Sequence, residues 1–143
     1  MRSSLETARV QVWSGRVTLR SRAPLRVLIV DDFAVGADAI AAYLTIETME
    51  CRIALGGLEA IATGTSWCPD VFVMDISMPI MNGFEATQAL RRDVRTSNAV
   101  IVAFTALDEA EVRRHPLSRS FDGYCQKGQS PAALVALIEH FIA

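Results

Sequence analysis

The sequence predicts an α/β fold in which a doubly wound sheet of five parallel strands carries helices on both faces. Two observations predict it. The apolar runs are apolar at nearly every position, which is typical of strands that are covered on both sides. They also alternate along the chain with apolar stripes at helical spacing, as crossover connections between parallel strands require. Right-handed crossovers would place the carboxyl ends of all five strands at one edge of the sheet.

The chain has 143 residues, of which 51% are hydrophobic, so it can bury one core of ordinary size. We expect a basic N-terminal extension over residues 1–24, with its boundary at Pro24, and one domain over residues 25–143. Residues 1–26 hold six arginines against one glutamate, whereas the remainder holds eight cations against fifteen acids. The extension is expected to be loosely ordered, and the partly alternating valines in it predict a short hairpin about Ser14-Gly15.

Several functional classes are disfavoured. The three cysteines are far apart and form no Cys-x-x-Cys pair, so neither a disulfide framework nor a zinc site is expected. The two histidines share no metal-binding spacing. No apolar run is long enough to cross a membrane, and the N-terminus lacks the apolar stretch of a signal peptide. We therefore expect a soluble, cytoplasmic protein without a membrane partner.

The first strand, residues 26–30, leads directly to Asp31-Asp32. A stripe from Ala37 to Leu44 then predicts a helix. A short strand over residues 51–55 follows. The next helix begins near Leu58 and is expected to stop near Gly64, because glycine commonly ends helices.

The third strand, residues 70–76, carries one carboxylate, Asp75, at its end. A turn built from Pro79, Asn82 and Gly83 comes next. Asn82 with Glu85 three residues later forms a capping box, which predicts a helix running to about residue 92.

The last third of the chain repeats this pattern. The strand over residues 99–104 is followed by Thr105, and a second capping box, at Asp108, opens a short helix that should end near Pro116. The fifth strand, residues 121–126, leads to Lys127. Ser130-Pro131 then begins the last helix, whose apolar stripe is Leu134, Leu137, Ile138 and Phe141.

The ends of four of the five predicted strands bring together three carboxylates, a hydroxyl and an ammonium, those of Asp31, Asp32, Asp75, Thr105 and Lys127. Crowded carboxylates need a cation at neutral pH, and hard oxygen ligands suit Mg²⁺. A carboxylate can attack phosphorus to form an acyl phosphate, with Lys127 offsetting the charge. We therefore interpret Asp75 as a nucleophile. Taken singly, each residue could be only a helix cap or a solvated side chain, so the inference depends on their joint occurrence.

From about Arg26 onward the sequence resembles the receiver domains of two-component response regulators. The resemblance rests on Asp31-Asp32 and on the segments 74–83, 104–106 and 124–127. It implies a flavodoxin-like sheet with strand order 2-1-3-4-5. It also implies a phosphorelay, in which a sensor histidine kinase or phosphotransfer protein donates a phosphoryl group and the receiver catalyses its own phosphorylation and dephosphorylation.

The resemblance assigns a role to each site residue. Asp75 is the phospho-acceptor, and Thr105 and Lys127 bind the phosphoryl group. The Mg²⁺ ligands are Asp31, Asp32, Asp75 and the backbone carbonyl of Ser77. Thr105 and Tyr124 form the switch. The helix after Asp108, the strand over residues 121–126 and the last helix are the surface implied for a downstream protein target, and direct DNA binding is not expected.

Two positions depart from the family pattern. Gly128 follows Lys127 where a proline is usual, so a trans peptide and a more mobile loop are expected. Pro116 shortens the helix after Asp108, which predicts an unusual target. A third position concerns the lifetime of the phosphorylated state. Leu107, two residues after Thr105, would flank the path of the attacking water. Its apolar side chain cannot orient that water by hydrogen bonding, so self-dephosphorylation is predicted to be slow.

Three alternatives remain open at this point. The chain could be the receiver segment of a larger hybrid histidine kinase rather than a protein that acts alone. It could be an aspartyl-phosphate phosphatase, although such enzymes generally have a second acid where Ser77 stands. It could also be a degenerate interaction module that is not phosphorylated, for which Gly128 is the motivation.

Overall fold

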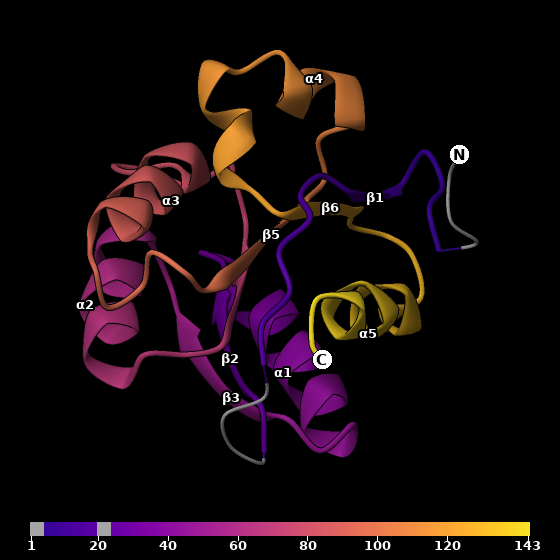
Figure 1. Cartoon of the computed structure of the whole chain (residues 1–143), viewed down its shortest axis with the longest axis horizontal. Coiled ribbons are helices and arrows are strands. Elements are labelled where there is room, and N and C mark those ends of the chain that lie inside the picture. Colours follow the sequence, from indigo (N-terminus) through magenta and orange to yellow (C-terminus); the bar gives the residue numbers. More distant parts are fainter. Residues whose placement is uncertain (1–4, 20–23) are drawn as a thin grey trace.

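The computed structural model describes residues 5–19 and 24–143. Its helices and strands alternate along the chain (Figure 1). The strands are β1 (Val10–Val12), β2 (Arg26–Val30), β3 (Glu50–Ala54), β4 (Val71–Met74), β5 (Val100–Thr105) and β6 (Gly123–Gln126). The helices are α1 (Ala34–Ile46), α2 (Gly57–Trp67), α3 (Gly83–Arg92), α4 (Glu109–Arg113), the 3₁₀-helix η1 (Pro116–Ser120) and α5 (Pro131–His140).

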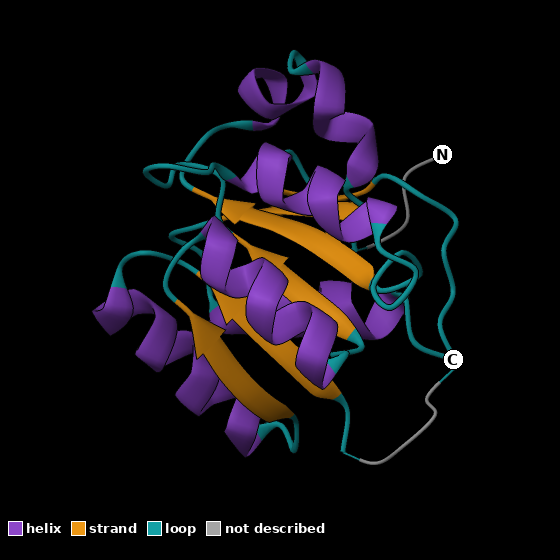
Figure 2. Cartoon of the chain, turned by 90° about the vertical axis from the view of Figure 1, so that its left-hand side faces the viewer, coloured by secondary structure: helices purple, strands orange, loops and turns teal. Residues whose placement is uncertain are grey.

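The strands form one sheet in the order β1-β6-β5-β4-β2-β3. The four pairings among β2, β3, β4, β5 and β6 are all parallel, and these five strands have the predicted order. Figure 2 shows helices in front of and behind this sheet, so the predicted α/β fold is confirmed.

Both faces of the sheet are buried because consecutive strand residues point to opposite sides. In β2, Val27 and Ile29 pack in the core that α1 and α5 cover. Leu28 and Val30 pack in the second core, beneath α2 and α3. None of these four side chains is more than 1% exposed, which explains why β2 is apolar at every position after Arg26.

The predicted count of five strands is wrong by one, since β1 is a sixth strand. It pairs antiparallel with β6, with Gln11 opposite Tyr124. This pairing replaces the hairpin predicted about Ser14-Gly15. Val10 is 3% exposed and belongs to the core, so its burial accounts for the apolar residues of this segment. Residues 1–4 and 20–23 of the predicted extension lie outside the described residues, and the boundary at residue 24 stays a prediction.

The predicted stop of α2 near Gly64 is also wrong, because α2 continues to Trp67. A Cβ atom at Gly64 would come within 2.8 Å of the Phe72 ring. Gly64 therefore allows α2 to pack closely on the sheet. The helix ends instead at Cys68, whose φ of 52° is left-handed.

The other helix boundaries follow their local chemistry. Both predicted capping boxes are present: Asn82 accepts from the amide of Glu85, and Asp108 accepts from that of Glu111. α4 ends at Arg113, and Pro116 begins η1 at a position where no backbone donor is needed. In the part of the chain that the structure describes, no helix has the length and apolar character needed to cross a bilayer.

Candidate functional site

Three acids, Asp31, Asp32 and Asp75, form a cluster at the carboxyl edge of the sheet. Asp31 follows β2 directly and Asp75 follows the neighbouring strand β4. The amide of Asp31 donates to the carbonyl of Ala54, and that of Asp75 donates to the carbonyl of Val30, so the hydrogen bonding of the sheet continues through both acids. Their side-chain positions are consequently set by the sheet.

The three acids each offer one oxygen ligand, and these atoms lie within 4.8 Å of one another. Asp31 and Asp75 are 4% and 6% exposed, whereas Asp32 is exposed. Hard carboxylate oxygens that converge beside solvent suit a magnesium or calcium ion, which can keep part of its water. The donor set therefore fits the expected Mg²⁺. Ser77 lies two residues after Asp75, in the loop between β4 and α3, and is itself exposed.

Lys127 supplies the positive charge at this acidic cluster. It follows β6, and its amide donates to the carbonyl of Thr105. Its Nζ lies 2.6 Å from Asp31 Oδ2 and 3.5 Å from Asp75 Oδ2. The ammonium lies over the ring of Phe104, with Nζ 5.7 Å from the ring centroid. Two carboxylates therefore share one partly exposed ammonium.

The remaining carboxylate oxygens are held by the backbone. Phe33 N donates to Asp31 Oδ1 at 2.9 Å, and Ile76 N donates to Asp75 Oδ1 at 2.8 Å. Burial raises the pKa of the Asp75 carboxyl to about 6; Lys127 lowers it and the Asp31 charge raises it. The cluster thus holds more negative charge than Lys127 alone can offset.

Gly83 allows the loop after Asp75 to fold back on the site. Its amide donates to the carbonyl of Ile76 at 2.9 Å. A Cβ atom here would clash with the Asp75 carbonyl oxygen and lie 2.8 Å from the Ile76 Cα. A glycine is therefore required for this close approach.

The two predicted switch residues lie on β5 and β6. Thr105 ends β5 with 1% exposure, and its Oγ accepts a hydrogen bond from Leu107 N at 3.3 Å. Tyr124 is fully buried, and its hydroxyl donates to the carbonyl of Leu107 at 2.7 Å. Burial raises the pKa of the Tyr124 phenol to about 12, so it stays a donor at neutral pH. The loop after β5 therefore links these two residues.

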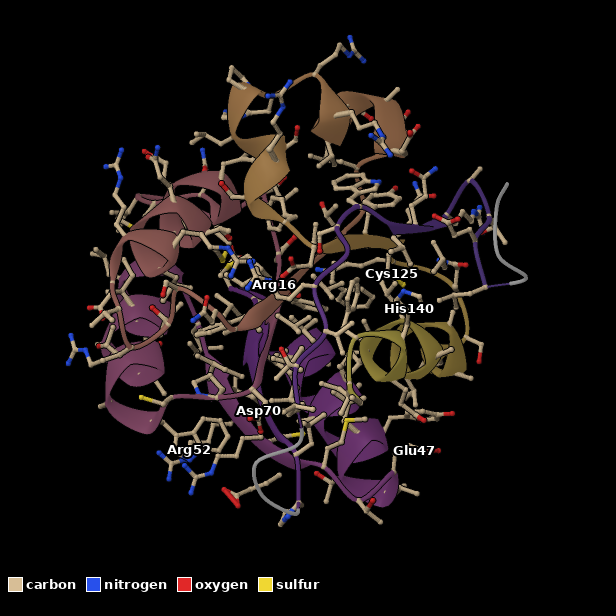
Figure 3. All side chains as sticks on the ribbon, viewed as in Figure 1. Arg16, Glu47, Arg52, Asp70, Cys125 and His140 are labelled. Atoms are coloured by element: carbon tan, nitrogen blue, oxygen red, sulfur yellow. The ribbon has the colours of Figure 1, made fainter. Side chains whose placement is uncertain are left out.

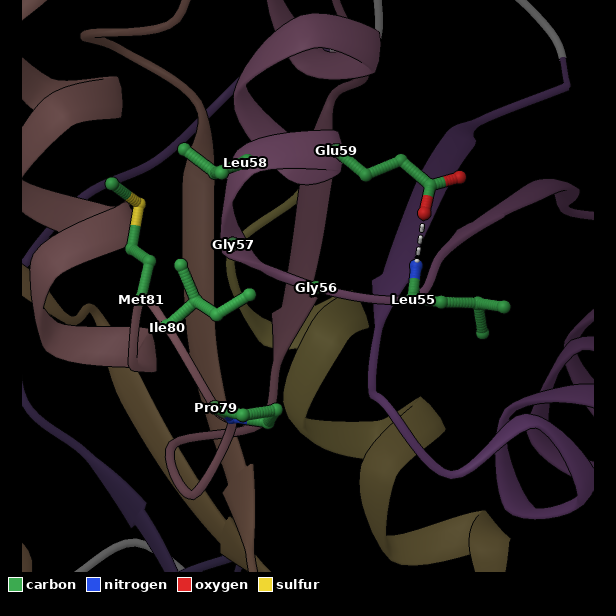
Figure 4. A pocket seen from close by; sticks show the side chains of 8 residues that line it. All are labelled: Leu55, Gly56, Gly57, Leu58, Glu59, Pro79, Ile80 and Met81. Carbon is green, nitrogen blue, oxygen red and sulfur yellow. Dashed lines mark hydrogen bonds between the residues drawn. The ribbon is translucent and has the colours of Figure 1, made fainter.

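Two hollows lie at the carboxyl edge. One, of about 260 Å³, is bordered by Asp31, Lys127 and the exposed Phe33. The other, of about 230 Å³, lies between the loops after β3 and β4, and Figure 4 shows its apolar wall. Leu58 and Ile80 of that wall are 58% and 92% exposed, so this edge carries apolar surface beside its charges.

The structure thus brings the three acids and Lys127 together and places Thr105 on the neighbouring strand. Gly128 has a φ of 96°, a conformation that glycine adopts freely, so it can end the Lys127 turn without strain. Sequence reasoning missed the packing of Trp13 on Tyr124, at a distance of 5.5 Å between ring centroids. No local pattern could have revealed it, because the two rings belong to opposite ends of the chain.

Comparison with known proteins gives consistent matches. The family model described as the response regulator receiver domain matches residues 27–139. The response regulator PleD of Caulobacter vibrioides is 36% identical over 83 residues, which are 58% of this chain and 18% of PleD. The chain therefore spans less than a fifth of the length of that curated relative.

Solved structures agree in fold. The chemotaxis protein CheY4 of Vibrio cholerae has a TM-score of 0.78 and 26% identity, covering 83% of this chain and 99% of that one. The response regulator TrrA of Thermotoga maritima, solved with Mg²⁺-BeF, has a TM-score of 0.75 and 26% identity over 82% of this chain and 98% of that one.

Proposed function

Since this chain belongs to the family of response regulator receiver domains, we propose that it is a phosphorelay signalling switch whose phospho-acceptor is Asp75. The observation that carries the proposal is the pairing of a buried carboxylate with two further acids and one ammonium at the end of adjacent parallel strands. A structural ion pair would need only one acid for the ammonium, and the excess of carboxylates points to a bound cation and to phosphoryl chemistry.

Asp75 is the nucleophile in this proposal. One oxygen of its carboxylate attacks phosphorus, an O–P bond forms, and the bond from phosphorus to the donor's leaving group breaks. The Ile76 amide holds Asp75 Oδ1, which fixes the direction of the carboxylate. Lys127 Nζ, now within 3.5 Å of Asp75 and bonded to Asp31, turns to an oxygen of the arriving phosphoryl group.

Mg²⁺ would be held by Asp31, Asp32, Asp75 and the Ser77 carbonyl. When bound, it offsets the negative charge that the carboxylates and the phosphoryl oxygens bring together. The partly exposed edge leaves room for its water. The protein's own share in the chemistry is to hold these oxygens near one another before the phosphoryl group arrives.

Thr105 and Tyr124 form the switch in this proposal. The Thr105 hydroxyl donates to the attached phosphoryl group, and the loop after β5 follows it. Because the Tyr124 hydroxyl is bonded to Leu107 in this loop, the movement reaches β6. The surface of α4, β6 and α5 then changes and a downstream protein target reads the change.

We infer that the phosphoryl donor is a sensor histidine kinase or a phosphotransfer protein, with the protein residing in the cytoplasm and without direct DNA binding. The hollow beside Asp31 and Lys127 and the exposed Phe33 offer apolar contact area next to Asp75 for such a donor. The same role suits a receiver that acts alone or one that is part of a larger hybrid kinase.

Intact-protein mass spectrometry after incubation with acetyl phosphate and Mg²⁺ tests the proposal. We expect one added phosphoryl group on the wild type and none on Asp75→Asn. The matched control is Asp38→Asn, an exposed acid of α1, which should be labelled like the wild type. Lack of labelling in the wild type would favour a degenerate interaction module. Turnover of a small phosphate ester beyond one equivalent would favour a phosphatase.

A further inference from the structure

A segment that we call the strap, residues 10–16, lies along the outer edge of β6 (Figure 1). The ladder between β1 and β6 has three residue pairs, and the amide of Gln126 also donates to the carbonyl of Arg9 at 2.8 Å. Beyond them, the amides of Trp13 and Ser14 both donate to the carbonyl of Asp122, at 2.8 and 3.1 Å. The strap thus occupies the sheet edge that β6 would otherwise present to solvent.

Side-chain contacts with Asp122 hold the carboxyl-terminal end of the strap. Asp122, which is 2% exposed, accepts from Ser14 Oγ at 2.8 Å and pairs with Arg16 Nε at 2.9 Å. Arg16, labelled in Figure 3, also donates to the carbonyl of Asn98 at 3.3 Å. Gly123 brings the strap close, since a Cβ atom there would lie 3.1 Å from the carbonyl oxygen of Gln11. These contacts position the strap without a long run of strand pairing.

The strap covers the ring of Tyr124 with Trp13. The two rings are stacked with an interplanar angle of 8°. The guanidinium of Arg113 lies 4.7 Å from the Trp13 centroid and donates to Gln11 Oε1, which also accepts from Trp13 Nε1. The strap therefore connects α4 to the face of the Tyr124 ring.

The opposite end of Tyr124 is bonded to the loop after β5. Its hydroxyl donates to the Leu107 carbonyl, and the Leu107 amide donates to Thr105 Oγ. Trp13 and Thr105 are consequently linked through a single buried phenol. A buried hydroxyl that loses its acceptor must find another, because leaving it unsatisfied is unfavourable.

We propose that the strap is an autoinhibitory cover over the β6 edge and that phosphorylation of Asp75 loosens it through Tyr124. The proposal rests on the proposed function. If the Thr105 hydroxyl turns to the phosphoryl group, the Leu107 amide loses its acceptor and the loop shifts. Tyr124 then changes its orientation to keep a hydroxyl partner, and the stack with Trp13 opens.

Loosening the strap exposes the hydrogen-bonding edge of β6 together with the Tyr124 ring. In the unphosphorylated chain the occupant of this edge is the chain's own β1. The strap and the phosphoryl group therefore favour different states of Tyr124. Linkage is reciprocal, so weakening the strap should strengthen the binding of a phosphoryl analogue by the same factor that phosphorylation weakens the strap.

The first test follows Trp13 directly. In Trp67→Phe, Trp13 is the one tryptophan left, because the chain has two. Adding beryllofluoride with Mg²⁺ should change the Trp13 fluorescence and speed hydrogen exchange at the β1 amides about fivefold. Tyr124→Phe in the same background keeps the ring but loses the bond to Leu107, so it should abolish the fluorescence change.

The second test uses linkage. Trp13→Ala should lower the beryllofluoride concentration needed for half saturation about fivefold, measured with Mg²⁺ by the chemical shifts of the Asp75 region. Trp13→Phe, which can still stack, should remain near the wild type. The control is Val17→Ala, because Val17 belongs to the same N-terminal extension but is 65% exposed. This variant should not change the beryllofluoride concentration needed for half saturation.

The outcomes separate the two proposals. If acetyl phosphate labels Asp75 but β1 exchange and the affinity of Trp13→Ala stay unchanged, the strap proposal is overturned and the phosphorelay function stands. If Asp75 is not labelled and beryllofluoride does not bind, both are overturned. A fluorescence change that persists in Tyr124→Phe would exclude the phenol as the link.

Discussion

Replacing Asp75 with asparagine should make the protein more stable in the absence of Mg²⁺. The Asp75 side chain is buried next to Asp31, and its one cationic partner among the described residues, Lys127, is shared with that acid. Burial raises the pKa of the Asp75 carboxyl to about 6 from an ordinary value of 3.8. The ionised form is therefore less favourable in the folded protein than in the unfolded chain.

The sign of the effect follows from linkage. A carboxyl whose folded pKa is raised destabilises the fold above that pKa, and the penalty is relieved as the pH falls from about 6 towards 4. The difference between a pKa of 3.8 and one of about 6 corresponds to a loss of about 3 kcal/mol in the free energy of unfolding at pH 8. This figure already includes the attraction of Lys127, and water at this partly open edge screens the charges, so we expect a net gain of about 2 kcal/mol.

Urea unfolding followed by circular dichroism measures this gain. At pH 8 in EDTA, Asp75→Asn should exceed the wild type by about 2 kcal/mol, and at pH 4.5 the difference should be small. Mg²⁺ at ten times its dissociation constant should then stabilise the wild type by about 1.4 kcal/mol and the variant less. Asp38→Asn, the exposed control, should change little. A variant less stable than the wild type in EDTA at pH 8 would refute the reasoning.

Three further changes test the geometry. Gly83→Ala should destabilise the fold by about 2 kcal/mol or more in urea unfolding, since its Cβ meets the Asp75 backbone, whereas Gly56→Ala, with open space around it, should be mild. Asp122→Ala should lower the free energy of unfolding by about 3 kcal/mol, because it removes the buried acid with which two half-buried guanidinium groups pair; retention of wild-type stability would count against that network. Phosphorylated wild type should lose its phosphoryl group slowly, and Leu107→Asn should hydrolyse faster; release within seconds from the wild type would contradict this prediction.

Strand positions were predictable because both faces of the sheet are covered. The runs around β2, β4 and β5 are apolar throughout, and the polar residues that follow them therefore mark the strand ends. The approach of Asp31, Asp32 and Asp75 follows from this topology. The 2.6 Å contact between Lys127 and Asp31 did not follow, since it depends on the side-chain conformation of a long, flexible residue.

The predictions that were wrong concern residues whose packing partners are distant in the sequence. The alternating Val10 and Val12 indicate an extended segment, but the choice between a local hairpin and the edge of β6 is made by contacts with distant residues. Gly64 likewise appeared to end a helix, whereas its small size serves packing on Phe72. Local patterns describe the conformation of a segment better than they describe its neighbours.

The charged groups are also distributed unequally between the two ends of the strands. At the amino edge, Arg91 and Arg16 both pair with Asp122, so a buried acid there has two cations. At the carboxyl edge, Asp31 and Asp75 share Lys127, and Asp32 adds a third carboxylate beside them. A phosphoryl anion that approaches this carboxyl edge alone is repelled, whereas a cation is drawn in. Binding should therefore be ordered, with the metal arriving first and the phosphoryl donor second.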